Sequence, residues 1–109
     1  MEVAIRHAEN GVVISVEGDV DLYSSPKLRE AILDSVKKKL SPIVMNLSSV
    51  TYIDSSGVAT LVEGLQLSKE YGGKFRLVEM SERISEVFQL ARLQQVFEIC
   101  GTEAEALGS

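Results

Sequence analysis

The residues of this chain that could carry chemistry gather in one run, Thr51-Tyr52-Ile53-Asp54-Ser55-Ser56-Gly57. Asp54, Ser55 and Ser56 are residue types that favour the start of a helix, where unpaired backbone N–H groups carry partial positive charge. Because a helix start accommodates an anion, a serine placed there can carry a phosphate group. The alternative interpretation is that Asp54 or Ser55 only caps the helix and that Gly57 only allows close packing.

A buried strand precedes this run, and an amphipathic helix follows it. Residues 43–47 are mostly apolar and predict a core strand that ends at Ser48-Ser49. The helix is expected to run to about Tyr71, where two glycines follow. Its predicted apolar face, at helical spacing, consists of Val58, Leu61, Val62 and Leu65.

The rest of the chain alternates between strand and helix patterns. Strands are predicted at residues 2–7, 12–17, 74–78 and 96–99, and Asn10-Gly11 is typical of a hairpin turn between the first two. Helices are predicted to begin at Ser25, as the N-cap residue before Pro26, at Ser81 and at Thr102. This order predicts an α/β fold: a mostly parallel central sheet with an antiparallel N-terminal edge strand and about four helices.

Two segments follow predicted strands and are therefore expected at the same end of the sheet. They are residues 18–25 and 48–57. Open α/β sheets usually bind ligands at this end. The topology predicts that the first segment brings four side chains near Ser55, namely Asp19, Asp21, Tyr23 and Ser24.

Two motifs resemble those of the STAS family, whose founding members are bacterial anti-sigma factor antagonists. They are Gly18-Asp19-Val20-Asp21 and Asn46-Leu47-(x2)-Val50-(x2)-Ile53-Asp54-Ser55-Ser56-Gly57. The resemblance runs from the first strand to about Ile99 and implies a single STAS domain over residues 1–109. Val20 stands where leucine is commoner, and Val58-Ala59 stands where Leu-Gly is commoner. These replacements are apolar or small, so the expected fold is unaffected.

In the antagonists of this family, the serine directly after the aspartate is phosphorylated by the anti-sigma factor, which is itself a kinase. The resemblance implies that the unphosphorylated chain binds this kinase and frees its sigma factor. Phosphorylation at Ser55 would then end the complex, and a metal-dependent serine phosphatase would reset it. The expected neighbours of the phosphate and contacts of the partner are Asp19, Asp21, Tyr23, Ser24, Asp54, Ser56, Gly57 and Val58.

The resemblance also leaves a second role open. The same fold serves as a subunit or scaffold of membrane lipid transporters and signalling complexes that have no phosphorylation cycle. Those relatives often read Asp-Ser-Ala-Gly, whereas this chain keeps Ser56, as the phosphorylated antagonists usually do. The second serine therefore favours the antagonist.

Composition excludes further classes of function. With 109 residues, of which 45% are hydrophobic, the chain fits one compact domain. Its formal net charge of −5 argues against nucleic-acid binding, which needs a basic surface. No stretch approaches the roughly 18 to 20 apolar residues of a membrane span, and the N-terminus lacks a signal-peptide pattern. A cytoplasmic protein without direct membrane insertion is expected.

Catalysis by the chain itself is not expected. His7 is the only histidine and Cys100 the only cysteine, which excludes an intramolecular disulfide and the usual zinc ligand sets. Ser55 has neither a Gly-x-Ser-x-Gly elbow nor a recognisable base. The chain also lacks a Gly-x4-Gly-Lys-Ser/Thr loop, so no cofactor is expected, and ATP would be bound by the partner.

Overall fold

The computed structural model describes residues 1–9 and 11–108, which form one mixed sheet with helices on both faces. The strands are β1 (Glu2–His7), β2 (Val12–Val20), β3 (Ile43–Ile53), β4 (Phe75–Val78) and β5 (Glu98–Cys100). The helices are α1 (Ser25–Lys37), α2 (Ser55–Glu70), α3 (Glu82–Leu90) and α4 (Glu103–Leu107), with a 3-10 turn η1 (Leu93–Gln95) after α3.

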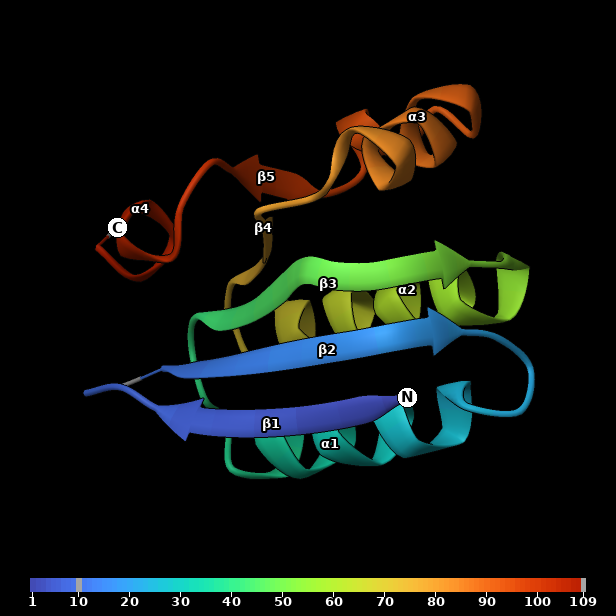
Figure 1. The fold of residues 1–109 in the computed structure, drawn as a ribbon. Helices are drawn as coiled ribbons and strands as arrows, with labels where there is room; N and C mark the ends of the chain where they lie inside the picture. The colour runs from blue at the N-terminus through green and yellow to red at the C-terminus, as the bar shows by residue number, and fades with distance from the viewer. Residues whose placement is uncertain (10, 109) are drawn as a thin grey trace.

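The strands lie in the order β1-β2-β3-β4-β5 (Figure 1). β1 is antiparallel to β2, and all other neighbours are parallel. The predicted fold class is therefore confirmed. Asn10, half of the predicted turn, lies outside the described residues, but Ala8 and Gly11 exchange backbone hydrogen bonds of 3.0 and 2.9 Å beside it.

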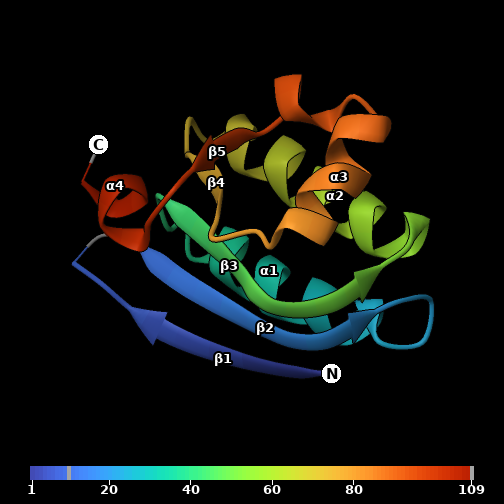
Figure 2. The same cartoon turned by 45° about the horizontal axis from the view of Figure 1, so that its top comes forward.

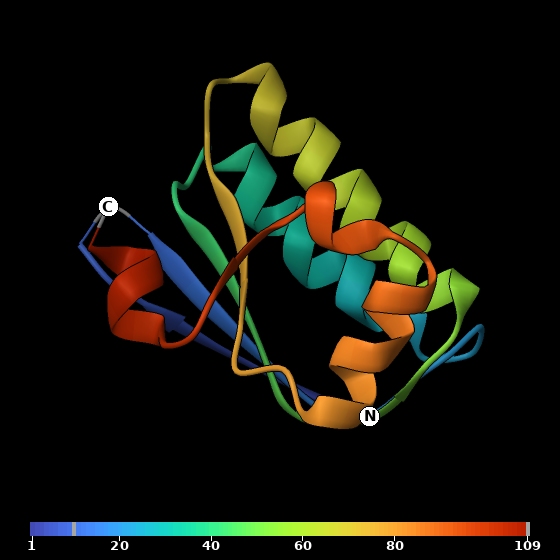
Figure 3. The same cartoon turned by 90° about the horizontal axis from the view of Figure 1, so that it is seen from above.

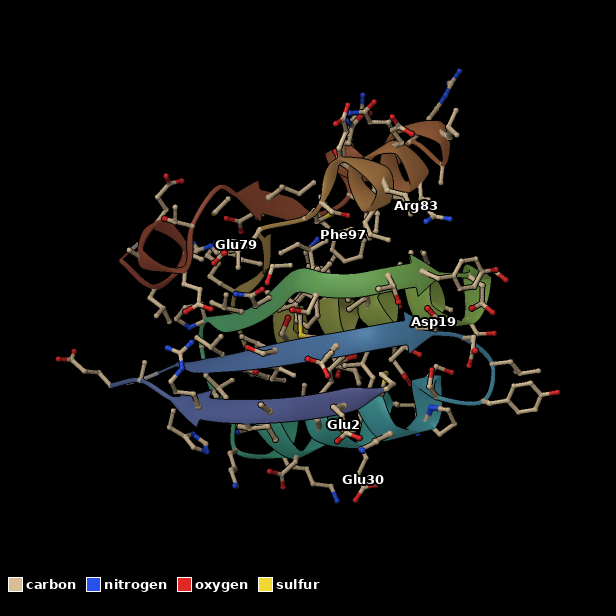
Figure 4. All side chains as sticks on the ribbon, in the orientation of Figure 1. Glu2, Asp19, Glu30, Glu79, Arg83 and Phe97 are labelled. Carbon is tan, nitrogen blue, oxygen red and sulfur yellow. The ribbon has the colours of Figure 1, made fainter. Side chains whose placement is uncertain are left out.

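One face of the sheet carries the main core. Helices α1, α2 and α3 cover this face, and α4 covers part of the other (Figures 2 and 3). Phe97 lies between α3 and the sheet (Figure 4), with its ring centroid 5.8 Å from that of Phe88 and 6.3 Å from that of Phe75. Burial of these aromatic rings fixes α3 against the sheet.

On the other face, α4 packs over a small second cluster. Ala106 is buried against three strand residues, Val13, Val44 and Val78. The buried Arg76 side chain donates from Nη1 to the Ala106 carbonyl at 2.8 Å and from Nε to Glu98 at 3.0 Å. A buried guanidinium needs such partners, so this bonding holds the C-terminal helix in place.

Both central strands are longer than predicted. β3 continues beyond Ser48-Ser49 to Ile53, and β2 continues beyond Glu17 to Val20. Val50 and Ile53 are buried, and Val20 pairs with Ile53 at the end of the ladder. Register irregularities in β2 interrupt the alternation of exposed and buried residues. The apolar stretches that predict these strands end before the irregular part, where exposed and buried residues mix, so the sequence places both strand ends too early.

Helix α1 begins one residue earlier than predicted. Its N-cap residue is Ser24, and Ser25 is already helical and buried. The Ser24 hydroxyl does not cap the helix, because its Oγ lies 2.8 Å from the carbonyl oxygen of Asp19 and 3.1 Å from Asp21 Oδ1. The Ser24 side chain therefore stabilises the preceding turn and not the helix.

The C-terminal third also differs in its boundaries. β4 begins at Phe75 rather than Lys74, and β5 covers Glu98–Cys100 rather than residues 96–99. The chain first makes η1 and buries Phe97 before it pairs with β4. β5 therefore begins later than predicted, because Phe97 first turns into the core.

The buried face of α2 is also rotated from the predicted one. Val58 and Val62 are only half-buried, and the buried residues are Gly57, Thr60, Leu61, Gly64, Leu65 and Ser68. A Cβ atom at Gly64 would lie 2.7 Å from the Phe75 ring and 2.9 Å from Ile32. The small residues of this face therefore allow α2 to lie close to its neighbours.

Gly64→Ala is expected to lower the free energy of unfolding. Overpacking costs about 1–3 kcal/mol, whereas replacing glycine within a helix gains about 1 kcal/mol. Urea unfolding of the variant measures the net loss. Ala59→Gly, at an exposed position of the same helix, measures the helix-propensity contribution alone. A Gly64→Ala variant that gains that amount would contradict tight packing.

Candidate functional site

Helix α2 starts directly at the end of β3, and Asp54 joins the two. The Asp54 carboxylate accepts hydrogen bonds from the backbone N–H groups of Ser56 and Gly57, at 2.9 and 3.1 Å. Its own N–H donates to the Val20 carbonyl at 3.1 Å. Asp54 therefore caps α2 and ties it to β2, as expected for an aspartate at a helix start.

Gly57 brings the first turn of α2 against both central strands. A Cβ atom there would lie 2.7 Å from Ile53 Cγ1, 2.8 Å from Val20 Cγ1 and 3.0 Å from the Val20 carbonyl oxygen. Only glycine fits this contact without displacing backbone. The position of Ser55, the first residue of α2, is therefore fixed while its side chain is exposed.

The turn between β2 and α1 is held by Asp21. Its Oδ1 accepts the backbone N–H groups of Tyr23 and Ser24, both at 3.0 Å, while its own N–H donates to Ser24 Oγ at 2.9 Å. These bonds leave Tyr23 with 91% of its surface exposed. The backbone bond from Ser24, aided by the Ser24 hydroxyl and the Tyr23 N–H, lowers the pKa of Asp21 below its ordinary value.

Asp19 lies at the carboxyl end of β2 (Figure 4) and accepts a hydrogen bond of 2.6 Å from Thr51 Oγ1 on β3. Gly18, just before it, has a φ of +98° at a register irregularity in the strand pair. Glycine adopts this conformation without strain, so the bulge can redirect the strand here. The sequence predicts a loop over residues 18–25, whereas in the structure Asp19 belongs to the paired end of a strand.

Two hollows lie at this end of the sheet. The first, the acidic hollow, is lined by Met1, Gly18, Asp19, Asp21, Tyr23, Ser24 and Thr51. The second, the α2–α3 groove, has a volume of about 370 Å³ and is lined by Ile53, Asp54, Ser55, Val58, Ala59, Val87, Ala91 and Leu93. The two hollows share no lining residue. The bond from the Asp54 N–H to the Val20 carbonyl links the start of α2 to the end of β2, the strand that carries Asp19.

The structure therefore divides the predicted site residues into two groups. Asp19, Asp21, Tyr23 and Ser24 line the acidic hollow. Asp54, Ser55 and Val58 line the α2–α3 groove, and Gly57, in the first turn of α2, is buried against Val20 and Ile53. Ser56 is half-buried, and its carbonyl accepts the Thr60 hydroxyl at 3.0 Å.

Sequence reasoning missed several residues at this end of the sheet. Leu22 and Tyr52 are 65% and 47% exposed. Val87 of α3 and Ala91, the C-cap residue directly after α3, line the groove beside Ser55. An apolar Leu22 next to Tyr23 in a turn was a usable signal, since turns seldom need two large apolar side chains. No local sequence pattern indicates that α3 contributes to the groove, because this contribution depends on tertiary packing.

Candidate catalytic groups do not meet here. His7 is exposed and pairs with Val12 at the other end of the sheet. Within residues 1–9 and 11–108, no cluster of three His, Cys, Asp or Glu side chains could hold a metal ion. No helix among the described residues is long and apolar enough to span a membrane.

Known proteins resemble this chain over nearly its whole length. A family model described as the STAS domain matches residues 2–106. The anti-sigma-B factor antagonist of Bacillus subtilis (strain 168) is 28% identical over 99 residues, which cover 91% of this chain and 90% of that protein. Anti-sigma factor antagonists are non-enzymatic regulators, which agrees with the expectation that this chain is not an enzyme.

Solved structures share the fold. An anti-sigma factor antagonist from Mycobacterium paratuberculosis has a TM-score of 0.83 at 25% identity, over 98% of this chain and 91% of that one. The antagonist SpoIIAA in its unphosphorylated form has a TM-score of 0.77 at 22% identity, over 98% and 96% of the two chains. SpoIIAA of Bacillus in its phosphorylated form has a TM-score of 0.76 at 23% identity, over 98% and 97%.

Removal of the Asp54 cap should destabilise the protein. Asp54→Ala is expected to lower the free energy of unfolding by about 1 kcal/mol, the usual cost of losing an N-cap acceptor. Asp54→Asn keeps an acceptor oxygen and should lose less. Denaturant unfolding of both variants tests the cap, and equal losses would show that the hydrogen bonds to Ser56 and Gly57 are not the cause.

The pKa of Asp21 can be measured by following its carboxyl resonance in an NMR titration. We expect it below the ordinary aspartate value, and Ser24→Ala should raise it because one of its hydrogen-bond donors is lost. Tyr23→Ala keeps its N–H and should leave the pKa unchanged. Since folding lowers this pKa, its contribution to stability is present above the unfolded-state pKa and is lost as pH falls through the folded-state pKa.

Proposed function

Because the chain belongs to the STAS domain family, we propose that it is an anti-sigma factor antagonist switched by phosphorylation at Ser55. Unphosphorylated, it binds an anti-sigma factor that is a serine kinase and thereby frees the sigma factor. The kinase then transfers phosphate from ATP to Ser55, and the complex dissociates. A serine phosphatase removes the phosphate and restores binding.

The observation that carries this proposal is the exposed Ser55 hydroxyl at a fixed helix start. Asp54 accepts the N–H groups of Ser56 and Gly57, so capping is performed by the aspartate and leaves the Ser55 hydroxyl available. A phosphate at Ser55 would also meet the positive end of the α2 dipole. This geometry favours the phosphoacceptor over the alternative in which the serine only caps the helix.

The switch acts through local charge. A phosphate adds about −1.5 to −2 charges at physiological pH. Asp54 lines the same groove as Ser55, and Asp19 and Asp21 line the neighbouring hollow. A partner that covers this surface must desolvate the added charge. A loss of about 3 kcal/mol weakens binding more than a hundredfold, so no refolding is required.

Two observations on relatives support a switch of this kind. SpoIIAA is known in an unphosphorylated and a phosphorylated form, and both resemble the present fold to nearly the same degree, with TM-scores of 0.77 and 0.76. One fold thus accommodates both states in that protein. For this chain we propose the same pair of states, in the cytoplasm, with ATP bound by the kinase and not by the chain.

The decisive experiment measures phosphate transfer. The purified chain is incubated with ATP and each anti-sigma-type kinase from the same genome, and its intact mass is recorded. We expect one phosphate on the wild type and on Ser56→Ala, and none on Ser55→Ala. Phosphate on Ser55→Ala but not on Ser56→Ala would move the acceptor to Ser56.

A binding measurement separates the antagonist from a scaffold. The kinase should bind the unphosphorylated chain and Ser55→Ala, and should bind the phosphorylated chain more than about a hundredfold more weakly. If no kinase binds or phosphorylates the chain, and a transporter ATPase co-purifies equally with wild type and Ser55→Ala, the scaffold role replaces the antagonist.

A further inference from the structure

We infer that the α2–α3 groove receives an apolar side chain of the kinase that phosphorylates Ser55. This inference rests on the proposed function and extends it, because it assigns part of the partner's binding surface to α3. Besides Asp54 and Ser55, the groove is lined by Ile53 at the end of β3 and by Val58 and Ala59 of α2. On the α3 side it is lined by Val87 of α3, by Ala91 directly after α3 and by Leu93 of η1.

Apolar side chains dominate these walls, yet the groove is open to solvent beside Ser55. A kinase must cover the Ser55 hydroxyl in order to transfer phosphate to it, and it therefore also covers the groove. A groove left unfilled in the complex would forfeit the contacts of its lining atoms. Filling it with an apolar side chain buries apolar surface on both molecules, as interface anchors usually do.

The α3 wall is built before the partner arrives. Ile84 and Phe88 are fully buried in the core, and the Phe88 ring packs against Phe97. Val87, next to Phe88 on the same helix, is therefore held at the groove without contact from another protein. A preformed wall reduces the ordering cost of binding.

Charge complementarity defines the occupant further. The neighbouring acidic hollow is lined by Asp19 and Asp21, both on the partner-facing end of the sheet. Met1 lines the same hollow, and its α-amino group offsets part of the charge of the two carboxylates. The remaining negative charge suits a basic side chain of the partner, while an apolar one fits the groove. Ser55 lies on the groove lining, so its phosphate would have to be desolvated beside the apolar anchor, which accounts for release.

Ala91→Glu tests the assignment, because it places a carboxylate at an exposed position of the groove wall. We expect the kinase to bind this variant at least about tenfold more weakly than the wild type, which is the usual minimum effect of blocking an interface anchor. Gln89→Glu is the matched control. It adds the same charge at an exposed position in the last turn of α3, outside the groove, and should bind as the wild type does. Thermal unfolding of both variants checks that α3 remains folded.

The outcomes separate the two proposals. If the wild type and Ala91→Glu bind the kinase equally, the groove assignment is wrong and the proposed function stands. The assignment is also wrong if Gln89→Glu weakens binding as strongly, or if Ala91→Glu changes only self-association of the chain. If no kinase binds the wild type, both proposals fail.

Discussion

The close approach of α2 to the ends of β2 and β3 is the constraint on which the rest of the site depends. Gly57 allows it because a Cβ atom would meet Val20 and Ile53 within 3 Å. The bond from the Asp54 N–H to the Val20 carbonyl then fixes where the helix starts. Every exposed group nearby, Ser55 above all, takes its position from this contact.

The same constraint explains why charged and apolar groups coexist at this end of the sheet. The Asp21 and Asp54 carboxylates are occupied by backbone N–H groups of a turn and a helix start. They therefore stabilise local structure and at the same time define an acidic surface. Asp19 is likewise bonded, to Thr51, at the end of its strand. The negative charge that would oppose partner binding, once a phosphate on Ser55 adds to it, thus comes from residues that the fold already needs.

Much of this arrangement could be predicted from the sequence because local chemistry determines it. Asp54 as a helix cap and the meeting of both strand ends follow from residue type and topology. The bulge near Gly18 could not be predicted, since it depends on how β2 pairs with β3. The true N-cap, Ser24, could not be predicted either, since the Ser24 hydroxyl bonds back to the Asp19 carbonyl. Helical spacing of the large apolar residues predicts a buried face of α2 that is rotated from the observed one. The reason is that small residues such as Gly64, and not the largest apolar ones, permit close packing.

The part that local sequence could not reveal is the contribution of α3. Its apolar residues predict a helix packed on the core, and Ile84 and Phe88 fulfil this role. The neighbouring Val87 is left half-buried at the edge of the same packing. Whether such a residue completes the core or lines a groove depends on where α2 starts. The contact at Gly57 therefore fixes both the position of Ser55, the proposed phosphoacceptor, and the apolar surface beside it, which is the geometry that the proposed charge-operated binding switch requires.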